Sequence, residues 1–418
     1  MVASHQLNTI VIVDAYSQAA SLVKAFNAQG YRCVHVRTVR QLHAYYEQSI
    51  CAQDYVETLW YDGDFAKLLQ QLAPYSITHV CAGFDMGVAL ADQLNEAFNL
   101  PGNGTALSAA RCDKYQQRLA LVQAQVKVPS FKCATDWREL AVWLDRQSLG
   151  PWVLKPLNSA SAEDVYRCHD VATAEAAFQR IQGKQNQCGI SNQHVLAEGF
   201  LTGREYRVNT VSRAGRCVVT DVWDMTKVVD GAGRFLYDQV ELLPATGAVQ
   251  KQLIAYIEQV LQALAITEGP TTSDIVMTKN GPVLVELGAR LMGGLFPIQY
   301  LQQCITATQL DVMIEAYAKP ERFAQRSVHY ALQQSAKLYL LRSQVSGQLQ
   351  AFRYLEDIQN LPTVRWVKPY LEPGDWLAVT HDYASSPMHL LLMGNAEAIA
   401  QDMHRIQQFE SLGLYVLQ

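Results

Sequence analysis

Residues 273–294 read SDIVMTKNGPVLVELGARLMGG, two runs rich in apolar and β-branched residues that are separated by a turn at 279–281. Runs of this kind on either side of a short glycine-containing turn predict a β-hairpin. If the loop has three residues, the register places Asp274 directly opposite Glu286. Their carboxylates then share one face of a sheet.

Such a pair of acids points to a divalent cation. Two carboxylates about 5 Å apart repel each other unless a cation lies between them. Mg²⁺ takes one or two carboxylate ligands and completes its shell with water and phosphate, which makes Asp274 and Glu286 candidate Mg²⁺ ligands. A two-residue loop would put them on opposite faces, and two solvated strand acids would give the same pattern. The residues alone therefore leave both interpretations open.

The N-terminal part of the chain alternates between strand-like and helix-like patterns. TIVIV at 9–13 leads into a helical pattern that ends at Gly30, and CVHV at 33–36 is strand-like again. This alternation predicts an open parallel sheet with helices on both faces. The turn at 14–17 lacks the glycines of a dinucleotide-binding turn. We therefore expect a scaffold that forms part of a substrate cleft.

Length and composition predict several globular domains. A chain of 418 residues exceeds what one hydrophobic core supports, and 49% hydrophobic with 17% charged residues excludes an intrinsically disordered protein. The sequence PGNG at 101–104 marks the first boundary. We predict domains at residues 1–105, 106–190, 191–325 and 326–418, and the last alternates like a small antiparallel α+β lid.

The net charge limits the possible binding partners, and the cysteine content indicates the cellular compartment. A net charge of −5 argues against a protein that binds the phosphate backbone of nucleic acid. The nine cysteines are odd in number and have no metal-binding spacing, which is typical of reduced cytosolic thiols. We find no signal-peptide pattern and no apolar run long enough for a membrane span. We expect a cytoplasmic protein that binds small molecules, and a homodimer is compatible with these features.

Two further segments suggest nucleotide binding. Lys155 ends an apolar strand pattern, and the small residues of the next loop, Ser159 and Ser161 among them, would let main-chain N–H groups approach a phosphate. A plain surface loop explains that composition equally well. In AEGFLTGRE at 197–205, the backbone after Glu198 could pair with an adenine, with a carboxylate left for ribose hydroxyls.

In their order along the chain, five segments resemble the ATP-grasp superfamily over roughly residues 5–320. Within it the resemblance is to the L-amino acid ligases of the bacilysin synthetase and dapdiamide amide ligase type. The segments are GFDMGVALADQLNEAFNLPGN, RCDKYQQR, VLKPLNSASAEDV, EGFLTGREYRVNTV and SDIVMTKNGPVLVELGARLMGG.

The resemblance implies an ATP-grasp fold of the α/β and α+β classes, with an N-terminal Rossmann-like sheet and a C-terminal lid. It implies an enzyme that uses ATP and Mg²⁺, for which Mn²⁺ can substitute, to join a carboxylate to an amine through an acyl phosphate, releasing ADP and phosphate. The alternatives are another ATP-grasp acyl-phosphate enzyme, of the purine-biosynthesis or carboxylase type, and a non-catalytic ATP-binding regulatory module. The module should lack the metal acids, and this chain has both.

The resemblance also implies roles for single residues. Asp274 and Glu286 would carry Mg²⁺, while Arg290 and Lys155 would be catalytic. A guanidinium suits the phosphoryl group and the substrate carboxylate because it binds two anionic oxygens at once. The nucleotide would contact Lys114, Lys155, Ser159, Ser161, Glu198, Gly199, Phe200, Leu201 and Glu205. The amino acid or carboxylate substrate would contact Asp238, Glu241, Arg290 and Gly293.

Three positions depart from the family pattern. The loop at 158–164 has no glycine, Asp274 stands where close relatives commonly have Glu, and Gly288 stands where many ATP-grasp enzymes have Asn. Any third metal ligand must therefore be water or substrate. We also predict that the loops at 158–164 and 226–235 close over the site and are poorly ordered without nucleotide.

Overall fold

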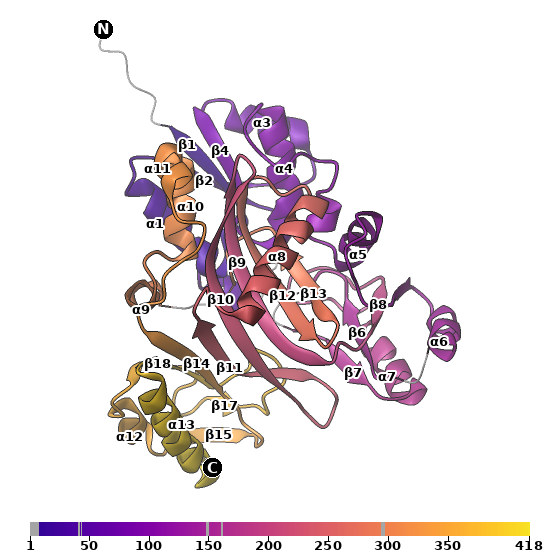
Figure 1. The fold of residues 1–418 in the computed structure, drawn as a ribbon, viewed down its shortest axis with the longest axis vertical. Coiled ribbons are helices and arrows are strands. Elements are labelled where there is room, and N and C mark those ends of the chain that lie inside the picture. The colour runs from indigo at the N-terminus through magenta and orange to yellow at the C-terminus, as the bar shows by residue number, and fades with distance from the viewer. Residues whose placement is uncertain (1–7, 41, 43, 148–149, 160–161, 294–296) are drawn as a thin grey trace.

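The chain builds four β-sheets with helices packed on their faces in the computed structural model (Figure 1). The sheet nearest the N-terminus is parallel and the others are antiparallel, which confirms the predicted mixture of α/β and α+β architecture. The structure describes residues 8–40, 42, 44–147, 150–159, 162–293 and 297–418.

The N-terminal sheet is parallel, with the strand order β3-β2-β1-β4. Ile10 and Ile12 of β1 pack with α1, whereas Val11 and Val13 pack with α3 and α4 on the other face. Helices therefore cover both faces, as predicted. The elements are β1 (Thr9–Val13), α1 (Leu22–Asn27), β2 (Arg32–Arg37), α2 (Ala44–Glu47), β3 (Glu57–Trp60), α3 (Phe65–Leu72), β4 (Ile77–Ala82) and α4 (Val88–Ala97).

The carboxyl ends of β1 and β4 form the part of this sheet that matters for ligands. Open α/β sheets bind ligands where connections leave neighbouring strands in opposite directions, and β1 lies between β2 and β4. The loop after β4 begins at Gly83, where a Cβ atom would lie 2.6 Å from the carbonyl oxygen of Asp14. Glycine thus lets the two strand ends approach closely, and the short 3₁₀ helix Asp85–Gly87 follows.

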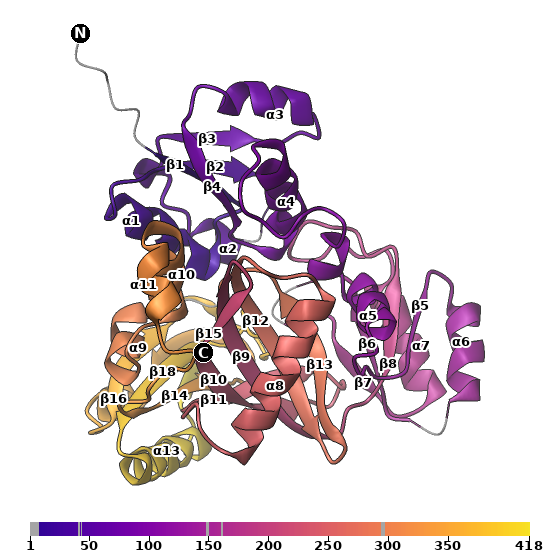
Figure 2. The ribbon, with the colours of Figure 1, turned by 45° about the horizontal axis from the view of Figure 1, so that its top comes forward.

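A small antiparallel sheet of order β5-β8-β6-β7 forms a lobe beside the rest of the molecule (Figure 2). Its core contains Leu154 of β6, Leu140 of α6 and Phe178 of α7. The helix α5 precedes the lobe and is capped by the side chain of Asp113. The elements are α5 (Lys114–Gln123), β5 (Phe131–Ala134), α6 (Trp137–Arg146), β6 (Trp152–Pro156), β7 (Tyr166–Cys168), α7 (Val171–Ile181) and β8 (Val195–Gly199).

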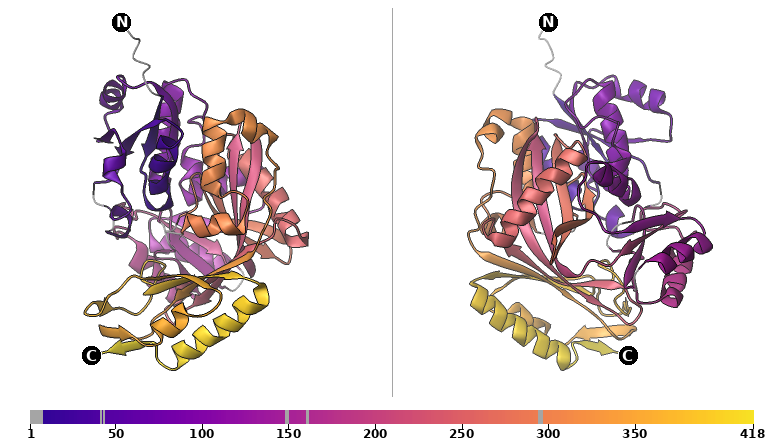
Figure 3. Two further views of the ribbon diagram at one scale, coloured as in Figure 1. Left: turned by 90° about the vertical axis from the view of Figure 1, so that its left-hand side faces the viewer. Right: turned by 45° about the vertical axis from the view of Figure 1, so that its right-hand side comes forward.

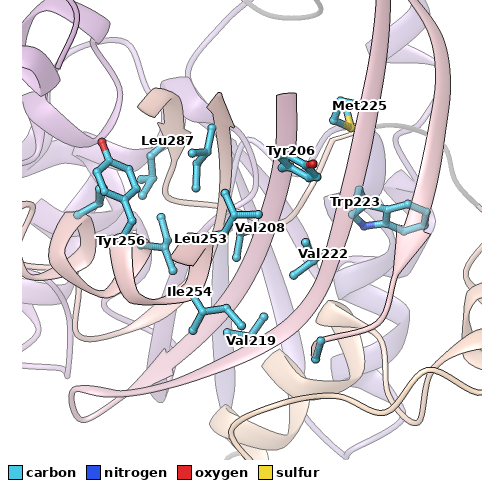
Figure 4. Close-up of a cluster of buried hydrophobic side chains, with 14 of the residues drawn as sticks. Tyr206, Val208, Val219, Val222, Trp223, Met225, Leu253, Ile254, Tyr256 and Leu287 are labelled. Atoms are coloured by element: carbon cyan, nitrogen blue, oxygen red, sulfur yellow. The ribbon is translucent and has the colours of Figure 1, made fainter. Parts of the chain in front are cut away.

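The large sheet has the order β13-β12-β9-β10-β11-β14-β18-β16. Leu253, Ile254 and Tyr256 of α8 pack with Val208 of β9 and Val219 of β10 in the main hydrophobic core (Figure 4). The elements up to residue 325 are β9 (Gly203–Arg213), β10 (Arg216–Val229), β11 (Phe235–Leu243), α8 (Ala248–Ala263), β12 (Gly269–Thr278), β13 (Gly281–Gly288), α9 (Ile298–Cys304), α10 (Gln309–Ala318) and α11 (Pro320–Gln325).

Three strands of the C-terminal part join the large sheet, and three others form a separate small sheet of order β17-β15-β19. Lys337 of β14 pairs with Glu241 of β11, so that β14, β18 and β16 extend the large sheet, and α13 packs at the end of the molecule opposite the N-terminal sheet (Figure 3). The elements are β14 (Ser335–Leu341), β15 (Gly347–Phe352), α12 (Leu355–Gln359), β16 (Val364–Pro369), β17 (Trp376–Leu377), β18 (Met388–Gly394), α13 (Ala396–Ser411) and β19 (Tyr415–Leu417).

The segment 226–235, which the sequence suggests is irregular, is the tip of a regular hairpin. β10 continues to Val229, and β11 starts at Phe235. The carboxylate of Asp230 accepts the N–H groups of Ala232 and Arg234 and so stabilises the turn between the strands. Whether its order depends on nucleotide stays a prediction, as do the domain boundaries. Among the described residues, no helix is long and apolar enough to cross a membrane.

Candidate active site

The hairpin of β12 and β13 brings the two predicted metal ligands together. Asp274 pairs with Glu286, which confirms the predicted register at this point. The predicted three-residue loop is wrong, because Thr278 pairs with Gly281 and the turn has two residues. That turn alone would place Asp274 opposite Val285, but a β-bulge at Val285 shifts the register by one residue.

Side chains from outside the hairpin hold the bulge in place. The Gln117 side chain accepts the N–H of Leu287 at 3.0 Å and donates to its carbonyl oxygen at 2.9 Å. The Arg118 guanidinium donates to the carbonyl oxygen of Val285 at 2.5 Å, and the Lys155 ammonium donates to it at 3.4 Å. Residues remote in sequence therefore fix the register that pairs the two acids.

Two cavities of about 420 Å³ each meet at this pair. Cavity A lies between the small sheet and the large sheet. Cavity B lies between the large sheet and the loops at the carboxyl ends of the N-terminal strands. The residues that line both are Lys114, Ser159, Ala162, Met225, Tyr237, Asp274 and Glu286.

Cavity A collects the predicted nucleotide-binding residues. Lys155 and Glu198 come from the neighbouring strands β6 and β8, and Glu205 comes from β9. Ser161 lies outside the described residues. The predicted nucleotide residues that line cavity A are Lys114, Lys155, Ser159, Glu198, Gly199, Phe200, Leu201 and Glu205.

The carboxylate of Glu198 is buried between two cations. It accepts from Nε of Arg118 at 2.6 Å and from Nζ of Lys155 at 2.7 Å. Burial opposes ionisation of Glu198, but the charges of Arg118 and Lys155 outweigh it and hold the pKa of Glu198 below its usual value. Its side chain therefore positions Lys155, and the backbone from Glu198 onward is what cavity A offers to a ligand.

The outer wall of cavity A is aromatic. The rings of Phe200 and Phe235 stack with centroids 6.3 Å apart, and the Arg167 guanidinium lies 4.3 Å from the Phe200 centroid. Glu205 forms an ion pair of 2.5 Å with Lys227 at another edge. A flat apolar wall together with a carboxylate beside a lysine suits a base and a sugar that carries hydroxyl groups.

Cavity B is assembled from distant parts of the chain. Thr38 and Asp85 follow strands of the N-terminal sheet, Arg290 and Gly293 follow β13, and Tyr383 precedes β18. Nε and Nη2 of Arg290 donate to Oδ2 of Asp85 at 3.1 and 2.8 Å. The structure thus brings the predicted substrate residues Arg290 and Gly293 into one cavity with a carboxylate from the N-terminal sheet.

At the junction of the cavities each acid is paired with a cation. Lys114 contacts Glu286 at 2.9 Å, and Arg207 donates to both oxygens of Asp274 at 2.7 and 2.9 Å. Burial opposes the ionisation of Glu286, but the charge of Lys114 outweighs it and lowers the pKa of Glu286 to about 2. The same contact outweighs burial at Lys114 and raises its pKa. Glu286 therefore presents anionic oxygens at neutral pH.

This donor set fits Mg²⁺. Asp274 and Glu286 are hard oxygen donors on adjacent strands, and both line both cavities. Within the described ranges no group of three or more His, Cys, Asp or Glu side chains could hold a metal ion. The remaining ligands would have to come from water and phosphate, which is the usual coordination of Mg²⁺ beside a nucleotide.

Two predicted substrate residues do not line either cavity. Asp238 pairs with Arg342 at 2.9 Å, and Glu241 pairs with Lys337 at 3.1 Å. Their neighbours Tyr237 and Val240 line cavity B instead. A β-bulge at Asp238, opposite Thr226 and Lys227, interrupts the strand alternation. Tyr237 and Val240, three positions apart, therefore share a face.

Sequence reasoning missed three charged residues of the site. Arg207 stands two positions after Glu205 on a strand, and this period-two spacing could have placed both on one face. Arg118 lies in the quoted segment RCDKYQQR, four positions after Lys114 on a helix, which is also a same-face spacing. Asp85 had no local signal, because its partner Arg290 lies 205 positions away.

Comparisons with known proteins agree with this fold. Residues 149–297 match the ATP-grasp domain family. Dapdiamide A synthase of Enterobacter agglomerans is 32% identical over 410 residues, which is 96% of each chain. An L-amino acid ligase from Bacillus licheniformis superposes over 99% of both chains, with a TM-score of 0.75 and 16% identity. N5-carboxyaminoimidazole synthetase from Staphylococcus aureus, solved with ADP, covers 95% of this chain and 96% of its own, with a TM-score of 0.68 and 15% identity.

Proposed function

The chain belongs to the L-amino acid ligase family of ATP-grasp enzymes, and we propose that cavity A binds ATP while cavity B binds the carboxylate that ATP activates. The enzyme joins a carboxylate to an amine in an ATP-dependent reaction. The likeness to the carboxyaminoimidazole synthetase extends to the fold alone, so the purine-type alternative is supported by the fold only.

The observation that carries the residue roles is the position of Asp274 and Glu286 at the junction of the two cavities, with Lys114 beside them. In cavity A the adenine would lie against the backbone of residues 199–201 and against Phe200. Glu205 would bind the ribose. Lys114 and Lys155, with Ser159, would bind the phosphates, and the γ-phosphate would then point into cavity B.

Asp274 and Glu286 would hold Mg²⁺, and Mn²⁺ has similar ligand preferences. The metal would neutralise charge on the phosphates. Arg207 and Lys114, which contact these acids now, would then be free to approach the transferred phosphoryl group or the substrate. Preorganised cations stabilise the charge of such a transition state because they need little reorganisation during the reaction.

In the first step a carboxylate oxygen attacks the γ-phosphorus, the bond to the bridging oxygen breaks, and ADP leaves. An amine then attacks the acyl carbon, an amide bond forms, and phosphate leaves with loss of a proton from nitrogen. Arg290 lines cavity B and would bind the carboxylate in the first step and the tetrahedral oxyanion in the second. Closure over cavity B would keep water from the acyl phosphate.

We also expect the enzyme to act in the cytoplasm, because all nine cysteines are free thiols. The substrates are small molecules, and a homodimer is compatible with the sequence.

The test is ADP release from ATP with all pairs of a panel of L-amino acids, followed by mass spectrometry of the products. We expect ADP release that requires a carboxylate and an amine and yields one amide bond per ADP. Glu286→Gln should abolish it, while Glu258→Gln, on the exposed face of α8, should not change it. ATP binding without substrate-dependent turnover for any pair would favour the regulatory module instead.

A further inference from the structure

Asp85, Gly288 and Arg290 form a compact group in the wall of cavity B. Asp85 comes from the loop after β4, whereas Gly288 ends β13 and Arg290 follows it. A Cβ atom on residue 288 would lie 2.5 Å from Oδ1 of Asp85 and 3.2 Å from Cζ of Arg290. Only glycine at 288 therefore leaves room for the Asp85 carboxylate against the strand end.

The contact with Arg290 uses one oxygen of Asp85. Within the described part of the chain, both hydrogen bonds to this side chain end on Oδ2, and they come from Nε and Nη2 of Arg290. Nη1 of Arg290 donates to the carbonyl oxygen of Leu291 at 3.0 Å. The Asp85 side chain is 26% exposed and the Arg290 side chain 15% exposed. A carboxylate and a guanidinium, both partly exposed, thus lie side by side in the wall of cavity B.

The arginine–carboxylate pairs of this chain are of two kinds: some use both carboxylate oxygens, and others, such as Arg118 with Glu198, use one. Arg207 contacts both oxygens of Asp274, and Arg326 contacts both oxygens of Glu315. A carboxylate that only positions an arginine has its best geometry in that two-oxygen form. Asp85 contacts Arg290 through one oxygen, so its Oδ1 accepts no hydrogen bond from Arg290 and is left for a second donor.

We propose that Oδ1 of Asp85 binds the ammonium group of the acyl donor while Arg290 binds its carboxylate. Asp85 is then a specificity-determining residue that selects carboxylates with an amino group on the neighbouring carbon. This inference rests on the proposed ligase function. Adjacent negative and positive groups match the two charges of a zwitterionic amino acid, and a charge-assisted hydrogen bond from an ammonium to a carboxylate is among the stronger contacts a site can offer.

The rest of the cavity wall indicates which side chain the donor carries. Tyr46, Phe84, Met86, Ile190 and Met292 line cavity B around the charged group. Apolar and aromatic walls favour an apolar side chain, because a polar one would lose its hydration without gaining partners. Leucine, methionine and phenylalanine are therefore suitable probes.

The experiment compares each probe with its counterpart that lacks the amino group: 4-methylpentanoate, 4-(methylthio)butanoate and 3-phenylpropanoate. Hydroxylamine replaces the amine substrate, so that the acyl phosphate is converted to a hydroxamate and phosphate. Values of kcat/KM for hydroxamate formation are measured for the wild type and for Asp85→Asn. Asp62→Asn, an exposed acid of the same N-terminal region that pairs with Lys67, is the matched control.

We expect the wild type and Asp62→Asn to prefer each amino acid over its counterpart by about 10- to 100-fold. In Asp85→Asn the preference should fall below about threefold, because kcat/KM falls more for the amino acids than for the counterparts. Gly288→Ala should reduce the preference in the same direction, because its methyl group would displace the Asp85 carboxylate.

An equal loss for both series in Asp85→Asn would overturn the proposal, since Asp85 would then act only by positioning Arg290. A wild type without preference would also overturn it. If the wild type uses neither series but releases ADP with other pairs of amino acids, the inference is wrong and the ligase function stands. Absence of ADP release with every pair would instead remove the ligase function itself.

Discussion

Cavities A and B have the same volume of about 420 Å³, but the chain builds them differently. The lining of cavity A comes from residues between Lys114 and Glu286, mostly on the strands of two facing sheets. The lining of cavity B reaches from Ser17 to Tyr383 and combines loops with strands and short helices from several parts of the chain. A nucleotide is the same molecule in every ATP-dependent enzyme, whereas the second substrate differs, and loops vary more easily than strands. Cavity A is therefore suited to a ligand shared by many enzymes, and cavity B to a ligand that differs from one enzyme to another.

The charges of the two cavities also differ in burial. In cavity A the Glu198 side chain is 6% exposed and lies between two cations. At the junction with cavity B the Glu286 side chain is 41% exposed beside Lys114. A buried charge that loses its partner destabilises the protein, whereas partly exposed pairs exchange partners at little cost. Loss of the Glu198 carboxylate should therefore affect stability, whereas changes at the junction and in cavity B should affect catalysis.

The largest effect should follow Arg290→Ala in cavity B. Loss of one donor to a developing oxyanion commonly lowers turnover by about 10²- to 10³-fold. Because Arg290 does not line cavity A, the dissociation constant of ATP should change less than about threefold, within the usual spread of remote substitutions. The measurements are ADP release at saturating substrates and ATP titration by calorimetry. Near-normal turnover at saturation would exclude Arg290 from the mechanism.

In cavity A, Glu198→Gln should lower the free energy of unfolding by about 3 kcal/mol, because it leaves Arg118 and Lys155 buried without an anion. Urea unfolding followed by circular dichroism measures this change. Glu139→Gln, which removes a surface pair with Lys132, should change stability by less than about 1 kcal/mol. Equal stability of the two variants would contradict the assignment of a structural charge cluster to cavity A.

The pH dependence of this effect tests its electrostatic origin. The pKa of Glu198 is lowered in the folded protein, so its ionised form contributes stability above its unfolded pKa of about 4.3. That contribution disappears as the pH falls from about 4.3 through the folded-state pKa. The difference in melting temperature between wild type and Glu198→Gln should therefore shrink below about pH 4. A difference that stays constant from pH 6 to pH 3 would show that packing, not charge, is responsible.

The smallest effects should come from β11, where neighbouring residues take different roles. Val240→Trp should raise KM for the carboxylate substrate about tenfold by overfilling cavity B. Asp238→Asn should change it by less than about threefold, since Asp238 contacts Arg342 outside the lining. Steady-state kinetics with varied carboxylate separate the two variants. A larger effect from Asp238→Asn would restore the role that the family resemblance suggests for that residue.

Most of cavity A could be predicted from the sequence because its residues lie in short segments with regular strand spacing. Lys155, Glu198 and Glu205 each end or begin a strand pattern, and the pairing of Asp274 with Glu286 followed from one hairpin. The prediction reached the right pair through a wrong loop length. The β-bulge at Val285 depends on Arg118 and Gln117, and no rule that considers the hairpin alone contains them.

The sequence by itself determined the alternation of strands and helices and the segments that line cavity A, because these follow from periodicity and turn chemistry over a few residues. Only the tertiary structure decided that Asp85 contacts Arg290 beside Gly288. It also decided that Tyr237 and Val240, rather than Asp238, line cavity B. The extension of the large sheet by β14, β18 and β16 likewise appears only in the folded chain. These contacts join segments that are far apart along the chain. Their geometry depends on how whole sheets pack, which local sequence patterns do not encode.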